Sequence, residues 1–360
     1  MWSYVLLVSI PFLLQHNIKA NTVSLDIRSS KNNKRALIVF WIFLFIMVAF
    51  RHESIGNDTL VYKEIFNMIM QSDWKTSLGR SAEVGYSFLN KVISLFTDDF
   101  RWILIISAFL SIYPIAKSYV KYSTDAFLTI ALFLTMSNFV LLFSGIRQAI
   151  AIALGMIAFE FTRNKKLFWF VIVIIIAVLF HISAFMLIFI YPLYHIKLKR
   201  KHLIFVIPVM GIVWFFNQQI FAFLGLILNQ FTDYDTDISQ TGSVTMLILF
   251  VIFVVLSYLI PDESKMDADT IGMRNFLLFA VVLQMFAPLH PLAMRMNYYY
   301  MVFIPLLIPK IIECRSVRMS QVAVIARHFL VVFFIVYFFI TAPSNNVLNT
   351  FPYQYFWQSI

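Results

Sequence analysis

An arginine at the start of an apolar stretch is the first feature of this sequence that could support chemistry. The segment FSGIRQAIAIALGMIAFEF, residues 143–161, places Arg147 and Gln148 ahead of a run of apolar residues. A charged side chain near hydrocarbon costs about 2.5–3.5 kcal/mol even on lenient insertion scales. Arg147 therefore marks either a binding site or a substrate pathway, or it forms an ion pair with an external carboxylate that fixes helix packing.

Similar polar residues stand at the ends of other apolar runs. They occur in RHESIGNDTLVY (51–62), in LFHIS (179–183) and in LHPLAMRMNYYY (289–300). His181 is a candidate proton acceptor, with an interhelical hydrogen bond as its alternative role. Asp58 is a second candidate, with capping of a following helix as the alternative. One outward-facing cavity could collect the polar residues of these motifs: Arg51, Asp58, Arg147, His181, His290 and Arg295.

The elements that must position these residues are membrane helices. The chain is 61% hydrophobic and 13% charged and contains 40 Phe, a composition that indicates an all-α polytopic membrane protein. We expect one integral membrane domain over residues 1–360, with the first apolar run retained as a span. Twelve apolar runs, or ten if some are partial, predict the spans: 2–14, 37–50, 102–116, 127–143, 146–161, 167–180, 182–196, 203–223, 244–260, 276–289, 296–312 and 322–340.

The basic residues predict the orientation. Alternate loops carry 19 Lys and Arg, the opposite loops carry eight, and Arg327 lies inside the last run. Cytoplasmic loops are enriched in Lys and Arg, so both termini are expected outside the cytoplasm and Arg147 at the outer end of its helix. This bias accounts for the formal net charge of +10, and no nucleic-acid partner is expected.

The largest external segment, residues 51–101, is expected to hold two amphipathic helices. Apolar residues recur at helical spacing around Val61 and Met68, and again around Phe88 and Phe96. Such helices lie along a membrane surface, where they could roof a site. Glu83, at the start of the second helix, is a third candidate base.

No metal or cofactor is expected. The single cysteine, Cys314, has no CxxC or CxxH neighbour, which excludes a disulfide framework and a thiolate metal site. A predicted external loop, residues 224–243, contains DYDTD (233–237). Its three carboxylates could bind Ca²⁺, but the loop lacks the glycine and distal glutamate of an EF-hand and is interpreted as solvated.

Four motifs in order resemble the EpsG family of exopolysaccharide and O-antigen polymerases, which are similar to Wzy proteins. They are RHESIGNDTLVY, then AEVGYSFLN (82–90), SGIRQAIAIAL (144–154) and FHISAFMLIFIYPL (180–193). The resemblance extends from about Ala36 to the tyrosines near Tyr300, and it is weaker in the last third, where Arg295 lies.

The resemblance implies a membrane-embedded glycosyltransferase with an arrangement like that of the GT-C class. Such enzymes join oligosaccharide repeat units carried on undecaprenyl diphosphate at the outer face of the bacterial inner membrane, and a chain-length regulator is an implied partner. Arg147, with Arg51 and Arg295, would bind the diphosphate, because a guanidinium can donate two parallel hydrogen bonds to phosphate oxygens. His181, Asp58 or Glu83 would accept the acceptor's proton, and Gln148, Tyr298 and Tyr299 would contact the substrate.

Two other functions remain open at this stage. A ligase or another transferase acting on lipid-linked glycans would use the same donor with a different acceptor. A flippase should carry polar residues through the bilayer and show two halves of similar pattern. The charges of this sequence cluster on one side instead, which favours a reaction at one interface.

Overall fold

The computed structural model describes residues 2–16, 31–79, 83–228, 240–344, 346 and 349–358. The secondary structure within these ranges is helical, apart from two isolated β-bridges. The chain forms two compact units, residues 1–187 with 325–360 and residues 188–324. An all-helical membrane protein is thus confirmed.

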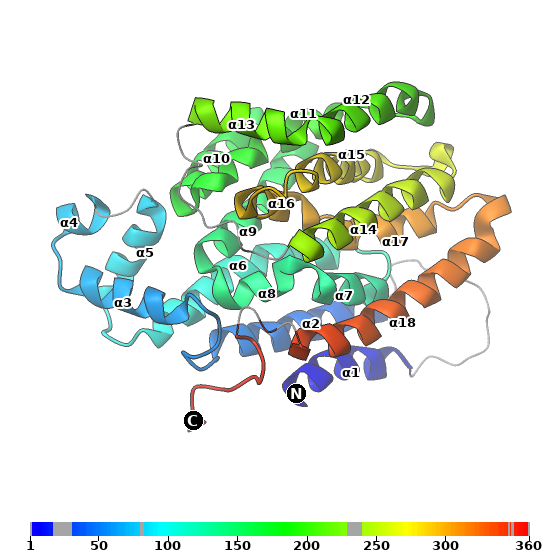
Figure 1. Cartoon of the computed structure of the whole chain (residues 1–360). Coiled ribbons are helices and arrows are strands. Elements are labelled where there is room, and N and C mark those ends of the chain that lie inside the picture. The colour runs from blue at the N-terminus through cyan, green and yellow to red at the C-terminus, as the bar shows by residue number, and fades with distance from the viewer. Residues whose placement is uncertain are drawn as a thin grey trace. The chain divides into compact units, whose positions relative to one another are not determined.

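The first unit contains the helices of the N-terminal half and most of the last helix. It consists of α1 (Trp2–His16), α2 (Lys31–Ala49), α3 (Thr59–Met70), α4 (Trp74–Gly79), α5 (Val84–Ser94), α6 (Arg101–Tyr122), α7 (Ala126–Thr135), α8 (Ser137–Ser144), α9 (Ile146–Arg163), α10 (Leu167–Phe180) and α18 (Ser320–Ser344). The 3₁₀ helix η1 (Ile182–Phe189) continues from α10 into the second unit. Helix α2 packs against both α1 and α6, and α9 packs against α6 and α10 (Figure 1).

The second unit is built around α15. Its elements are α11 (Ile190–His195), η2 (Arg200–His202), α12 (Leu203–Phe215), α13 (Asn217–Leu228), α14 (Gln240–Leu259), η3 (Glu263–Lys265), α15 (Ala268–Gln284), α16 (Pro291–Met301), α17 (Ile304–Glu313) and η4 (Val317–Met319). Helix α15 contacts α11, α14, α16 and α17. Inside this unit Asn297 donates hydrogen bonds to Ala280 O at 3.1 Å and to Gln284 Oε1 at 2.8 Å, so buried amides link α16 to α15.

The structure does not confirm twelve spans. Within the described ranges, four helices are long and apolar enough to cross a membrane: Lys31–Ala49, Arg101–Tyr122, Gly242–Leu259 and Val317–Ser344. The number rises to six if each of two bent helix pairs is counted as one span. Several predicted runs are shorter helices of 10–17 residues, below the ~20 residues that a straight span needs.

One predicted span, residues 127–143, is broken at Met136. Helices α7 and α8 meet there at 61°, with Met136 in an extended conformation. The Thr135 hydroxyl donates to Ala131 O at 3.2 Å and to Leu132 O at 2.9 Å. A hydroxyl that bonds back to the preceding turn competes with the backbone ladder and bends helices. The predicted span 127–143 is therefore a bent pair of helices in the structure.

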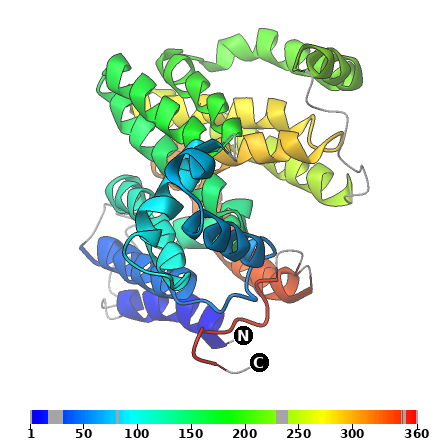
Figure 2. The same cartoon turned by 90° about the vertical axis from the view of Figure 1, so that its left-hand side faces the viewer.

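Residues 51–101, which the sequence predicts to be external, contain α3, α4 and α5, which lie at the left of Figure 1 and face the viewer in Figure 2. Their inner faces bury Tyr62, Phe66 and Tyr86 in one core with residues of α6 and α9. Several residues of the predicted apolar faces are exposed: Val61 52%, Met68 47%, Phe88 53% and Phe96 84%. An exposed apolar face is what a helix lying along a membrane surface requires.

Both chain ends lie at the same end of the first unit (Figure 2). The Tyr4 hydroxyl donates to Thr350 O at 2.6 Å, and Tyr353 donates to Met47 O at 2.5 Å. Arg51 also forms an isolated antiparallel bridge with Tyr355. The C-terminal segment therefore packs against the residues that follow α2, where the first polar motif begins.

Candidate active site

Arg147 lies in the first turn of α9, two residues after the N-cap residue Gly145. Its guanidinium forms an ion pair with Glu83, and the Arg147 side chain is 33% exposed. The Tyr62 ring lies 5.5 Å from the guanidinium carbon, within the range of a cation–π interaction. Arg147 Nε is buried and has no hydrogen-bond partner among the described residues. Arg147 therefore has a carboxylate partner, as one of its two predicted roles requires, and the guanidinium remains partly accessible beside it.

Glu83 bonds to a second residue from another motif, His181. Its Oε1 lies 2.5 Å from His181 Nδ1, and the two side chains are 10% and 15% exposed. A carboxylate at Nδ1 favours the tautomer with the proton on that nitrogen, which leaves Nε2 as the acceptor. Arg147, Glu83 and His181 thus form one contiguous cluster, in which Glu83 orients the other two side chains.

A glycine allows this meeting of α5 and α10. A Cβ built on Gly85 would lie 3.0 Å from the backbone of Leu179, closer than ordinary packing allows. Gly85 follows Glu83 by two residues, and Leu179 precedes His181 by two. The close helix approach therefore brings the carboxylate to the imidazole, and it explains the glycine in AEVGYSFLN.

A second glycine holds the first polar motif against the start of α9. Gly56 has a φ of +88°, a backbone conformation that L side chains rarely adopt. A Cβ at this position would also collide with the carbonyl group of Phe143. The turn after α2 thus packs against the end of α8, two residues before Gly145.

The pKa of Glu83 lies below the ordinary carboxyl range. Burial by itself raises this pKa, but the hydrogen bond from His181 and the charges of His181 and Arg147 outweigh the burial. The carboxylate is therefore ionised at neutral pH. A carboxylate that is ionised and already bonded to two neighbouring side chains is suited to orienting a base and poorly suited to being the base.

Arg51 is a buried cation near this cluster. Its side chain is 1% exposed and Nη1 donates to Val48 O, whereas Nε and Nη2 have no partner within the described part of the chain. Burial lowers the pKa of Arg51 to about 10, so the guanidinium stays charged at neutral pH. Tyr62 and Tyr86 lie close enough to interact electrostatically with both Arg51 and Arg147.

The tyrosine pair between the two arginines was not predicted as part of the site. Tyr62 and Tyr86 are 3% and 2% exposed, and their ring centroids are 5.3 Å apart in an edge-to-face arrangement. Both tyrosines belong to the quoted motifs, one in DTLVY and the other in VGYSF. In the sequence, the two tyrosines follow Asp58 and Glu83 by about one helical turn. Ordinary core residues show the same spacing, so it does not identify site residues.

Asp58 occupies the predicted N-cap position of α3, but its side chain makes no capping hydrogen bond. Its backbone N–H donates to Ser144 Oγ at 3.4 Å, and the residue is exposed. Asp58 also lies near enough to Tyr62 for a charge interaction. The capping role is therefore not supported, and the carboxylate stays a candidate at the rim of the cluster.

The remaining predicted site residues have less direct positions. Gln148 is 4% exposed, next to Arg147 on α9. Arg295, Tyr298 and Tyr299 belong to the second unit, so their place relative to Arg147 stays a prediction. Tyr299 is fully buried and Tyr298 is partly exposed, which makes Tyr298 the more accessible ring. The DYDTD segment lies outside the described residues.

Other charged residues of the helices have structural roles. At the far end of α9, Glu160 forms ion pairs with Lys121 at 3.0 Å and with Arg163 at 3.6 Å. Arg327, inside α18, forms an ion pair with Asp125. These cations already have local carboxylate partners, which distinguishes them from Arg51.

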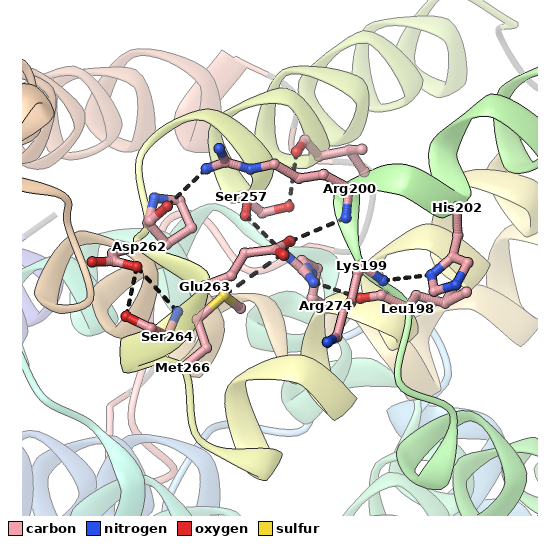
Figure 3. A network of polar contacts seen from close by, with 12 residues as sticks. Leu198, Lys199, Arg200, His202, Ser257, Asp262, Glu263, Ser264, Met266 and Arg274 are labelled. Atoms are coloured by element: carbon pink, nitrogen blue, oxygen red, sulfur yellow. Dashed lines mark hydrogen bonds and ion pairs between the residues drawn. The ribbon is translucent and has the colours of Figure 1, made fainter.

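In the second unit, Arg274 is a structural clamp. It is 1% exposed and donates from Nη2 to Leu198 O at 2.6 Å (Figure 3). Its guanidinium carbon lies 4.0 Å from the centre of the Tyr258 ring. Glu263 accepts from both Arg274 Nη1, at 3.5 Å, and the backbone N–H of Arg200, at 3.1 Å. The network joins α15 to the segments before η2 and after α14. In the sequence, Arg274 contributes only to the distribution of basic residues that predicts the orientation. Its burial and hydrogen bonds show that it also anchors the segment before η2.

The fold and the cluster define an all-helical membrane protein with an Arg–Glu–His site at the end of a helix bundle. Comparison with known families gives a match to the EpsG family model over residues 34–355. The chain therefore belongs to the EpsG family, as the motifs predicted, and this membership implies a function like that of a polysaccharide polymerase. No curated protein and no solved structure matches the chain.

Proposed function

We propose that this protein polymerises oligosaccharide repeat units carried on undecaprenyl diphosphate, at the outer face of the bacterial inner membrane. The observation that carries the proposal is the cluster of Arg147, Glu83 and His181, which joins three of the four family motifs through direct bonds. The cluster combines a cation for a leaving diphosphate with an imidazole for a proton. A glycosyl transfer from a lipid diphosphate needs both groups.

The proposed reaction is a displacement at the anomeric carbon of the donor. The acceptor hydroxyl forms the new C–O bond, the bond from the anomeric carbon to the diphosphate oxygen breaks, and undecaprenyl diphosphate leaves with the electron pair. His181 Nε2 takes the proton of the hydroxyl during attack. A positioned base of this kind contributes roughly 10²–10⁴ in rate.

Arg147 acts on the leaving group. Its exposed part can donate to two phosphate oxygens and stabilise the charge that develops on the diphosphate. Arg51 supports the same charge from inside the protein, since its buried Nε and Nη2 donors lack partners within the described ranges. Glu83 is the orienting carboxylate and not the base, because its ionised form is already bonded to both neighbours.

The test separates the charge of Arg147 from its shape. Arg147→Lys keeps a cation beside Glu83 but loses the planar fork, and it should lose most polymer at normal protein abundance. Arg147→Ala should lose all polymer. Arg163 is the matched control, since it is an arginine on the same helix with its own carboxylate partner. With Arg163→Lys and Arg163→Ala, the amount of polymer per molecule of protein should stay at the wild-type level.

Gel analysis of surface polysaccharide measures the polymer, and immunoblots of membranes measure the abundance of the protein. An ion pair that only fixes packing predicts the opposite pattern, with Lys tolerated and Ala lowering the amount of protein. An abundant Arg147→Ala protein that makes normal polymer would refute the mechanism. A deletion strain should accumulate single capped repeats, whereas loss of a flippase would leave none.

A further inference from the structure

An apolar groove lies on the surface of the first unit, along the line where α2 packs against α6. Its volume is about 670 Å³. Phe109 and Tyr113 form one wall as a stacked pair, with ring centroids 5.3 Å apart. The groove is lined along its length by Ile38, Trp41, Ile42 and Phe45 from α2, and by Phe109, Ile112, Tyr113, Ala116 and Val120 from α6.

The length of this groove matches one leaflet of a bilayer. Its lining runs from Lys34 to Phe45 on α2. At ~1.5 Å per helical residue these positions lie about 16 Å apart. Half of a hydrocarbon core of ~30 Å is about 15 Å. A lipid acyl chain of one leaflet therefore fits the groove from end to end.

One end of the groove is basic. Lys34, Lys117 and Lys121 all line it, and all three are exposed. Lys121 shares its charge with Glu160 at 3.0 Å. For Lys34 and Lys117 no ion pair occurs within the described part of the chain. The groove thus ends in positive charge that no carboxylate of the described residues pairs at Lys34 or Lys117.

The basic end lies away from the candidate active site. Lys34 is near the beginning of α2, and Arg51 follows the end of the same helix. Seventeen residues separate the two, which corresponds to ~26 Å along a helix axis. The distribution of basic residues places the Lys34 end on the cytoplasmic side. The groove and the active site therefore face opposite leaflets.

We propose that this groove binds an anionic phospholipid of the cytoplasmic leaflet. One acyl chain lies between α2 and α6, and the phosphate meets Lys34 and Lys117. Basic pockets between membrane helices on the cytoplasmic side bind such head groups. The proposal uses none of the residues of the glycosyl-transfer site, so either can fail without the other.

The test measures lipid binding to the full-length protein in detergent. Dioleoylphosphatidylglycerol is titrated and its binding is read by native mass spectrometry, with dioleoylphosphatidylcholine as the neutral comparison. The double variant Lys34→Gln/Lys117→Gln should bind phosphatidylglycerol about 30-fold more weakly, from the ~1 kcal/mol that each lysine contributes near an anionic surface. Lys165→Gln/Lys166→Gln is the matched control, because it removes two exposed lysines outside the groove.

A second variant blocks the groove without changing charge. Ile42 is 55% exposed on the groove wall, and Ile42→Trp should fill the space and displace the lipid while the protein stays folded. Equal losses in the groove variant and the control would overturn the proposal, since general surface charge would then explain binding. Equal affinity for the two lipids would overturn it as well. Displacement of phosphatidylglycerol by substoichiometric undecaprenyl phosphate would assign the groove to the prenyl lipid instead.

Discussion

Glu83→Gln is the substitution that most directly tests how the cluster works. It keeps the size of the side chain and an acceptor oxygen for His181, but it removes the charge that Arg147 faces. The side chains of Glu83, Arg147 and His181 are 10%, 33% and 15% exposed. Breaking a fully buried pair costs about 3–5 kcal/mol, and an exposed pair is worth about 0–1 kcal/mol. Because a third of Arg147 reaches solvent, we expect a loss of about 2 kcal/mol.

The effect on activity should exceed the effect on stability. Without the carboxylate, the imidazole is held less firmly and the charge that it gains during proton transfer is not stabilised. Rates should fall by roughly 10²–10⁴, the range of general-base contributions. Glu64→Gln is the control, because Glu64 is an exposed carboxylate on neighbouring α3. It should change neither polymer output nor melting temperature.

Glu83 also predicts a pH dependence with a definite sign. Its pKa is depressed in the folded protein, so the stability that it contributes is fully present above the ordinary carboxyl pKa of about 4.3. This contribution is lost as the pH falls through the lower, folded pKa. The wild type should therefore lose stability below about pH 4 by a component that Glu83→Gln lacks.

Two measurements decide the Glu83 prediction: polymer length and yield in a complemented deletion strain, and the apparent melting temperature of protein purified in detergent. A Glu83→Gln protein with wild-type polymer and an unchanged melting temperature would show that the carboxylate neither orients His181 nor balances Arg147. Reduced stability with full activity per molecule would leave Glu83 a packing residue only.

Three further predictions concern the base, the clamp and the topology. His181→Gln keeps hydrogen bonding but cannot take a proton, so polymer should fall by roughly 10²–10⁴ while Asp58→Asn is tolerated; the reverse result on polysaccharide gels would make Asp58 the base. Arg274→Met removes the donors of a buried clamp and should lower stability by about 2 kcal/mol in a detergent melting assay, and an unchanged melting temperature would contradict the clamp. Reporter fusions after Asn90 should read extracytoplasmic and those after Lys201 cytoplasmic, and a reversal at Asn90 would separate the site from its donor.

Three polar residues that the sequence singles out, Arg147, His181 and Glu83, lie together in the structure, whereas the predicted number of spans is not confirmed. Arg147, His181 and Glu83 were each chosen because they stand at the predicted outer side of an apolar segment. Their direct bonding could not be predicted, because it depends on the approach of α5 to α10 at Gly85. Helix approach is set by side-chain fit between segments about a hundred residues apart, and a single sequence carries no record of that fit.

The structure does not confirm the span count, for a related reason. Hydropathy reports how strongly a segment avoids water, and that preference is the same for a membrane span, a bent helix and a short buried helix. The run 127–143 is buried almost throughout, yet it turns by 61° at Met136. The hydrogen bonds of the Thr135 hydroxyl and the tertiary contacts decide the bend. Neither of them changes the apolar composition of the run, from which the span was predicted.

Composition and motif order alone determined that this is a helical membrane protein of the EpsG family, because burial preference and short motifs are properties of the chain itself. The tertiary structure decided the roles within the site. It made Glu83 an ionised link between Arg147 and His181, it left Asp58 outside the bonded cluster, and it inserted two tyrosines between the arginines. A side chain's role depends on its neighbours' charges and on the water that they exclude, and only folding brings those neighbours together.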